Sequence, residues 1–327
     1  MKKITKHIAL FLSGLIALAL ILTAVSNAIA PVYKTEKDRM DSLYTKRNEI
    51  TALAIGNSGC RAIDFETLGL KGYNLWKGGT DLFETDKMAR IAVPELPNLK
   101  TIFIPVAFFS FVQDNGKIQT RQDLRVRYYV ILQSVGYWGL INDDFRNFVL
   151  GVLAPLARGD HWKAVFGNLL FGESEKVKQM HAIDKYGNIG RKRYDGITPE
   201  KIGKWASIHI ALVNEITRNY PDVGEEVLKS FKKSVKFLKK QKGLRVIYFI
   251  PPIYQSYTKI IEKRKGEYID RAIDIMRGIE KEYNVEFYDH SFDQDFVNDP
   301  NLFFDENHLN EQGGKLFSAK FKKELGL

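Results

Sequence analysis

Short apolar runs without a polar alternation are the feature that most constrains the fold of this 327-residue chain. Four of them have the character of strands, namely Ile50 to Ile55, Thr101 to Phe109, Arg245 to Ile250 and Val285 to Tyr288. Each is rich in β-branched or aromatic residues, which is typical of strands covered on both faces in a parallel sheet. Gly72 to Leu75 is a fifth, shorter candidate.

Helical patterns separate these runs along the chain. They cover Arg61 to Leu68, Glu225 to Lys240, Tyr257 to Tyr283 and a terminal segment from about Glu311 to Glu324. Strands that alternate with helices predict the α/β class with a parallel sheet.

One long excursion interrupts this alternation. Residues 112–202 are rich in aromatic and basic residues, have helical periodicity and contain no convincing strand. We interpret them as a mostly helical insertion, because a plain connection is far shorter. Within it, the polar and Gly-punctuated stretch Asp184 to Gly196 fits either a mobile lid or a surface hairpin.

The composition excludes several classes of protein. With 45% hydrophobic residues and a single Cys, the chain is neither disordered nor stapled by an internal disulfide. His7, His161, His181, His209 and His290 form no metal-like spacing, so we expect no metal and no cofactor.

The N-terminal segment predicts a membrane signal. From Ile8 to Tyr33 no residue is charged, and three Lys residues precede the apolar core of this stretch. It is long enough to cross the roughly 30 Å hydrocarbon layer as a helix. Ala28-Ile29-Ala30 has the form of a processing site, so a cleaved signal peptide is the alternative, but the following Pro31 favours an uncleaved anchor.

We therefore expect an anchor or signal peptide at residues 1–30 and an α/β domain at residues 31–327. The positive cluster at the extreme N-terminus places that end in the cytoplasm and the domain outside the inner membrane, in the periplasm or at the cell surface.

The net charge favours an anionic partner. Residues 1–30 hold three of the 49 Lys and Arg and none of the 39 acids, so the remainder carries 46 − 39 = +7. Much of this excess lies between Leu228 and Arg245, where Phe231, Val235 and Leu238 form an apolar stripe with Lys residues around it. The simple interpretation is a solvated helix face. We expect no nucleic acid partner, because the domain is expected outside the cytoplasm and no binding motif for nucleic acid occurs.

Two polar motifs carry the expected chemistry. Gly56-Asn57-Ser58-Gly59 follows the first strand, so Ser58 stands at a sharp turn where the ligand crevice of a parallel sheet lies. Near the other end, the spacing Asp305-x-x-His308 lets the carboxylate reach a ring nitrogen of the His. Together they fill the roles of nucleophile, base and orienting acid. Cys60 is a rival nucleophile, and we interpret it as a small buried residue instead.

These motifs make the chain resemble the SGNH/GDSL hydrolase family. The resemblance is carried by Gly56-Asn57-Ser58, by Asn74-Leu75-Trp76-Lys77-Gly78-Gly79 after the second strand, and by Asp305-Glu306-Asn307-His308. It implies a three-layer α/β/α fold with a flavodoxin-like parallel sheet. It also implies Ser58 as nucleophile, His308 as base, Asp305 as acid, and the N–H groups of Ser58 and Gly79 in the oxyanion hole.

The sequence departs from the family in two places. Asn57 replaces the usual Asp, and no Gly-x-Asn-Asp block follows the strand at Thr101 to Phe109, so a third oxyanion donor is unassigned. Ser110 is a poor candidate for that role.

The N-terminal segment and the motifs look most like the subgroup that modifies acyl groups of envelope polymers. The resemblance therefore implies an esterase or acyltransferase acting on an acylated carbohydrate or other envelope polymer. The inner membrane and a membrane acyl-transfer protein are the further partners it implies. An assembly or acyl-carrier-docking protein that keeps the fold with little turnover is the alternative.

Overall fold

The computed structural model describes residues 2–29, 31–117, 166, 170, 183–188, 198–219 and 222–327. The chain divides into two compact units. One comprises residues 1–42 and 121–183, and the other comprises residues 43–120 and 184–327.

The N-terminal segment is helical. Helix α1 spans Lys2–Ile29 and α2 spans Pro31–Thr45. Among the residues that the structure describes, no helix has both the length and the apolar character that membrane crossing requires. The expectation of a spanning anchor in the first 30 residues therefore gains no support from the structure.

A five-stranded parallel sheet forms the centre of the second unit, with strand order β2-β1-β3-β4-β5. Its strands are β1 (Ala52–Gly56), β2 (Gly72–Trp76), β3 (Thr101–Pro105), β4 (Arg245–Ile250) and β5 (Glu286–Asp289). All five runs expected from the sequence are strands, and the α/β class is confirmed. The strand expected at Thr101 to Phe109, β3, is shorter than expected, because the chain leaves the sheet after Pro105. It turns at Ala107, whose N–H donates to Ser110 Oγ at 2.9 Å.

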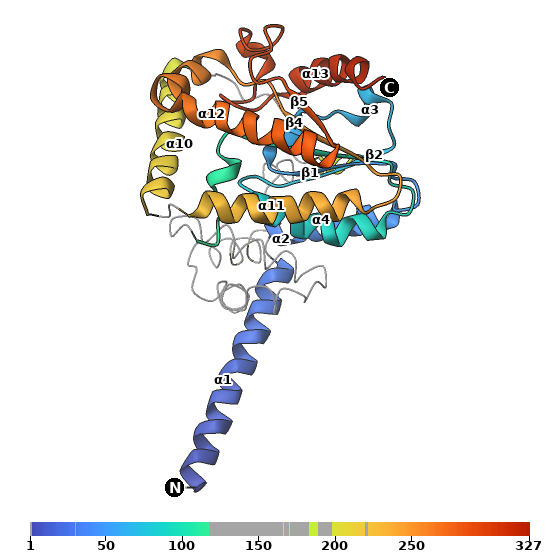
Figure 1. Cartoon of the computed structure of the whole chain (residues 1–327). Coiled ribbons are helices and arrows are strands. Elements are labelled where there is room, and N and C mark those ends of the chain that lie inside the picture. Colours follow the sequence, from blue (N-terminus) through green and yellow to red (C-terminus); the bar gives the residue numbers. More distant parts are fainter. Residues whose placement is uncertain are drawn as a thin grey trace. The chain divides into compact units, whose positions relative to one another are not determined.

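Helices cover both faces of this sheet (Figure 1). On one face lie α4 (Leu82–Ala92) and α11 (Val223–Lys239), and on the other lie α3 (Phe65–Leu68) and α13 (Glu311–Glu324). Two neighbouring residues of β4 therefore pack against helices on opposite faces. The centre of the Tyr248 ring lies 5.3 Å from that of Phe231 of α11, and the centre of the Phe249 ring lies 6.1 Å from that of Phe317 of α13. Both faces are apolar, which explains the missing alternation.

The connections use further helices. Among the described residues, the 3-10 helices are η1 (Ser58–Ala62), η2 (Val93–Glu95), η3 (Ser110–Val112) and η5 (Pro300–Leu302). Two further α-helices of this unit are α10 (Pro199–Asn219) and α12 (Gln255–Tyr283). The apolar stripe expected around the Lys-rich segment is confirmed, since Phe231, Val235 and Leu238 of α11 are buried.

Side chains and loops protect the two edges of the sheet. At β5, Phe287 donates its N–H to Glu280 of α12 and accepts a hydrogen bond from Arg277 at its carbonyl. At β2, Asn74 donates its N–H to the carbonyl of Tyr186, in the turn formed by residues 184–188. Edges that are occupied in this way resist pairing with other chains.

The prediction of a single helix from Arg61 to Leu68 is wrong. Arg61 to Leu68 is not continuous, because Ile63 is extended and Asp64 starts a new helix, α3, by accepting the Thr67 N–H at 2.9 Å. Asp is a strong N-cap, and it separates η1 from α3.

The predicted insertion falls mainly outside the described residues. Its described parts are residues 112–117, 166, 170, 183–188 and 198–202, and of the expected lid or hairpin only residues 184–188 belong to them. Those five residues form a turn closed by the Gly187 N–H, which donates to the Asp184 carbonyl at 3.0 Å.

Candidate active site

Ser58 begins the 3-10 helix that follows β1, an inner strand of the sheet. Asn57 caps this helix, because its Oδ1 accepts the Gly59 N–H at 2.8 Å. An N-cap residue needs a side-chain oxygen that accepts a hydrogen bond. The amide oxygen of Asn57 supplies it, as the carboxylate of an Asp would. Gly59 has no room for a larger side chain, since a Cβ there would lie 2.8 Å from the Pro105 side chain. The turn therefore holds Ser58 at the carboxyl edge of the sheet.

Asp305 and His308 lie on a closed turn before α13. Phe304 donates its N–H to the His308 carbonyl at 2.7 Å, and Phe303 and Leu309 form an antiparallel bridge beside it. Asn310 caps α13 through the Gly313 N–H and donates its amide to the Asn301 carbonyl at 2.6 Å. This network fixes the turn from both sides.

The structure brings the three predicted catalytic side chains together. His308 Nε2 lies 2.5 Å from Ser58 Oγ, and His308 Nδ1 lies 2.7 Å and 2.9 Å from the two carboxylate oxygens of Asp305. A carboxylate only accepts hydrogen bonds, so the Asp305 contact assigns the ring proton to Nδ1 and leaves Nε2 as acceptor for the Ser58 hydroxyl.

Electrostatics keep the acid ionised. Burial disfavours the carboxylate, but the His308 ring, the Asn307 N–H and the Arg61 cation outweigh it and hold the pKa of Asp305 below its usual range. An ionised Asp305 stabilises the imidazolium that forms when His308 accepts a proton.

The neighbouring carboxyl group behaves in the opposite way. Glu306 is buried, and burial together with the nearby charge of Asp305 raises its pKa to about 7. Two adjacent acids of one turn therefore differ in charge near neutral pH, and only Asp305 contacts the His308 ring.

Gly79 lies in the loop after β2, with a φ of 74° that favours glycine. Its carbonyl accepts hydrogen bonds from the side-chain amides of Gln113 at 3.2 Å and Asn115 at 2.9 Å. Sequence reasoning missed these two buried residues, which hold the Gly79 loop. The N–H of Gly79 stays a predicted donor to the oxyanion. Asn115 is not proposed as the missing third donor, because its amide also contacts Glu84.

The second block has a structural role at its first residue. Asn74 is fully buried and donates its amide to the Cys60 carbonyl at 3.0 Å, while its own oxygen accepts the Trp76 N–H. This joins β2 to η1 behind Ser58. Cys60 is a buried thiol outside any disulfide, as expected. The Ser110 hydroxyl caps its own turn.

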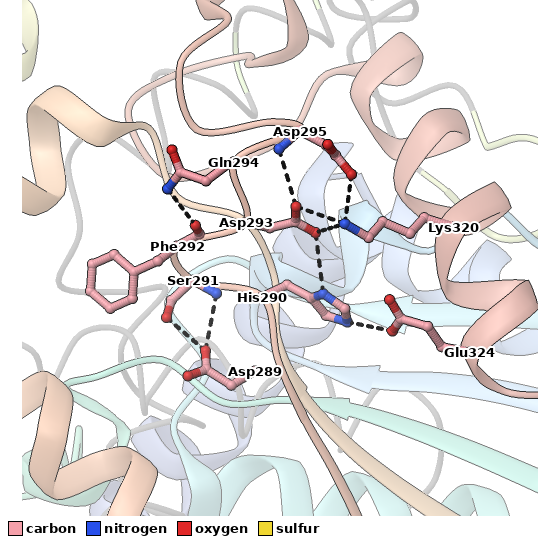
Figure 2. Close-up of polar contacts among 9 residues, drawn as sticks. All are labelled: Asp289, His290, Ser291, Phe292, Asp293, Gln294, Asp295, Lys320 and Glu324. Atoms are coloured by element: carbon pink, nitrogen blue, oxygen red, sulfur yellow. Dashed lines mark hydrogen bonds and ion pairs between the residues drawn. The ribbon is translucent and has the colours of Figure 1, made fainter.

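His290, which follows β5, belongs to a separate ionic cluster. Figure 2 shows its ring between two carboxylates, with Nδ1 3.4 Å from Asp293 and Nε2 3.1 Å from Glu324. Lys320 of α13 bridges Asp293 and Asp295 at 2.7 Å each. The cluster therefore ties the loop after β5 to α13.

A hollow of about 490 Å³ opens beside this cluster, with Arg277, Tyr288 and Phe292 among its lining residues. None of the triad residues lines it. Within the described ranges, no group of three or more His, Cys, Asp or Glu side chains is arranged to hold a metal ion.

Comparison with known proteins adds no assignment to this geometry. No family model matches the chain, and no curated protein matches it at a significant level.

Proposed function

We propose that this protein is a serine esterase or acyltransferase that acts through an acyl-serine intermediate. The observation that carries the proposal is the unbroken chain of contacts from Ser58 Oγ through the His308 ring to the Asp305 carboxylate. Nucleophile, base and orienting acid at hydrogen-bond distance form the arrangement that activates a serine hydroxyl.

The first half of the reaction forms the acyl-serine. Ser58 Oγ attacks the ester carbonyl while His308 Nε2 takes the hydroxyl proton, and the carbonyl oxygen becomes an oxyanion. The N–H groups of Ser58 and Gly79 are the proposed donors to that oxyanion, at roughly 3 to 4 kcal/mol for each well-placed donor. The tetrahedral intermediate then collapses and expels the alcohol, which receives the proton from His308.

The second half resolves the acyl-serine. Water or an acceptor hydroxyl gives its proton to His308 and attacks the acyl carbonyl, which releases Ser58 and either a free acid or a new ester. Both outcomes use the same three side chains. The choice between hydrolysis and transfer therefore depends on which hydroxyl reaches the acyl-serine.

The substrate class is the finer part of the proposal. We propose an ester-linked acyl group on an envelope carbohydrate or similar polymer, supported by the family resemblance of the motifs and by the basic character of the chain. An extracytoplasmic location rests on the positive cluster at the N-terminus and stays a prediction.

Covalent labelling tests the proposal directly. A fluorophosphonate probe should label the purified full-length protein, and Ser58→Ala should abolish the labelling. p-Nitrophenyl acetate hydrolysis should disappear in the same variant. Equal labelling of both proteins would reject Ser58 as the nucleophile, and labelling of neither would favour the assembly or docking role.

A further inference from the structure

We propose that Arg61 is a positioning residue for the triad, which holds the Phe304 to His308 turn against the helix of Ser58 and places a fixed positive charge near Asp305. This rests on the proposed function above. The motifs that pointed to the triad contain no Arg, so sequence reasoning gave Arg61 no role.

The short helix η1 places Arg61 on the same side as the nucleophile. Ser58 and Arg61 are three residues apart in a 3-10 helix, which has three residues per turn, so their side chains lie one above the other. Arg61 is only 8% exposed. A long cationic side chain is rarely so buried without specific contacts.

Two aromatic rings contact the guanidinium from different parts of the chain. Its carbon lies 4.2 Å from the ring centre of Phe304, at the start of the catalytic turn, and 5.4 Å from the ring centre of Trp76, at the end of β2. A flat guanidinium stacks on such rings, whereas an ammonium group does not stack as a plane. Arg61 thus connects the helix of Ser58, the strand β2 and the turn of His308.

The opposite side of η1 is fixed by α13. The Arg61 carbonyl would lie 3.2 Å from a Cβ at Gly314, so the two backbones approach closely there. Ser318 donates its hydroxyl to the Ala62 carbonyl at 3.1 Å and accepts the Asp64 N–H at 2.7 Å. These contacts set the distance between η1 and α13, and the Arg61 side chain sets the orientation of the turn above them.

The charge of Arg61 acts on Asp305. An Arg side chain stays protonated at every relevant pH, and its field is one of the causes that lower the pKa of Asp305. The other titratable groups that interact with this carboxylate, among the described residues, are His308, Glu306 and the buried Tyr257 of α12, whose pKa the Asp305 charge helps to raise. Removal of Arg61 would therefore take a fixed cation away from Asp305, which lies beside Glu306.

Two substitutions separate the charge from the stacking. Arg61→Met keeps an apolar stem but removes the charge, and Arg61→Lys keeps the charge but removes the flat group. In Arg61→Met, we expect the Asp305 carboxyl titration, followed by carbon-13 NMR of the full chain, to move up by about half a pH unit or more. The kcat of this variant for p-nitrophenyl acetate should fall roughly tenfold or more.

Arg61→Lys should leave the Asp305 titration in place and lower kcat only. Arg90→Met is the matched control, because the Arg90 guanidinium lies 4.5 Å from the Phe237 ring and pairs with Asp86 at 2.9 Å, on a helix that carries no triad residue. That control should change neither readout.

The proposal is overturned if Arg61→Met keeps the Asp305 titration and hydrolyses the ester within about twofold of wild type. Equal rate losses in both Arg61 variants, with the Asp305 titration unmoved, would also overturn it, because that result reports packing alone. The NMR readout needs no turnover. A failure of the proposed function, seen as hydrolysis that survives Ser58→Ala, is thereby distinguished from a failure of this inference.

Discussion

His308 Nε2 lies 2.5 Å from Ser58 Oγ, although 250 positions separate the two residues in the sequence. The contact forms because β1 delivers Ser58 to the carboxyl edge of the sheet and the turn before α13 reaches the same edge. Parallel strands gather their C-terminal loops at one edge, which brings distant residues into one site.

The triad should behave as a unit in kinetics. Ser58→Ala and His308→Ala should each remove nearly all hydrolysis of p-nitrophenyl acetate, and the double variant should be little worse than either single one. Asp305→Asn should retain a rate above the Ser58→Ala background, because His308 stays in place without its stabilising charge. Cys60→Ser is the control and should keep most activity. An active Ser58→Ala paired with an inactive Cys60→Ser would transfer the nucleophile to Cys60.

The cap at Asn57 should tolerate Asp but not Ala. Asn57→Asp still offers an oxygen to the Gly59 N–H, whereas Asn57→Ala leaves that donor without its cap. The loss of such a cap costs about 1 kcal/mol. We expect fluorophosphonate labelling of Asn57→Asp to stay within a few-fold of wild type and that of Asn57→Ala to slow about tenfold. Similar labelling rates for Asp and Ala would show that the cap does not position Ser58.

Glu306 should make the protein less stable as the pH rises. Its pKa is raised from 4.5 to about 7 in the folded protein, so the folded state retains a proton that the unfolded chain releases. The favourable contribution is therefore complete below pH 4.5 and is lost as the pH rises through 7, by up to about 3 kcal/mol.

Chemical denaturation of wild type and Glu306→Gln at pH 5 and pH 8 measures this effect. The Gln variant should be more stable than wild type at pH 8 and close to it at pH 5. A difference that is the same at both pH values would show that the Glu306 charge does not matter.

The Lys320 ion pairs should matter at neutral pH and not in acid. Burial of Asp293 opposes its ionisation, but Lys320, the Asp295 N–H and His290 hold the pKa of Asp293 below its ordinary 3.8. A lowered carboxyl pKa gives stability that is present above pH 3.8 and is lost as the pH falls through the folded value. Lys320→Met should therefore lower the free energy of unfolding by about 1 kcal/mol at pH 7.

That loss should shrink toward zero near pH 2.5. Lys315→Met is the matched control on the same helix, because Lys315 pairs with Glu311 and both side chains are more than half exposed. Its effect should stay below about 0.5 kcal/mol at either pH. A Lys320→Met loss that persists in acid would indicate lost packing against Phe296, whose ring centre lies 5.9 Å from the Lys320 nitrogen.

Local pattern was enough to locate the elements that carry the site. The run Arg245 to Ile250 is β4 at both ends, and the terminal helix begins at Glu311 as expected. These segments can be recognised in the sequence because a strand buried on both faces, or a helix buried along one stripe, has a regular apolar pattern. The break at Ile63 and Asp64 was missed, since a capping Asp inside an otherwise helical pattern looks like an ordinary polar position.

The sequence by itself determined the α/β class and the residue types at Ser58, Asp305 and His308, because strand pattern and the spacing of Asp305 and His308 are local properties. Only the tertiary structure decided that Ser58 meets His308, that Gln113 and Asn115 hold the Gly79 loop, and that Arg61 lies between Phe304 and Trp76. Each of these contacts joins segments that are far apart in the chain or on different elements. Their formation depends on the order of the strands and the packing of α13 against η1, which no local pattern encodes.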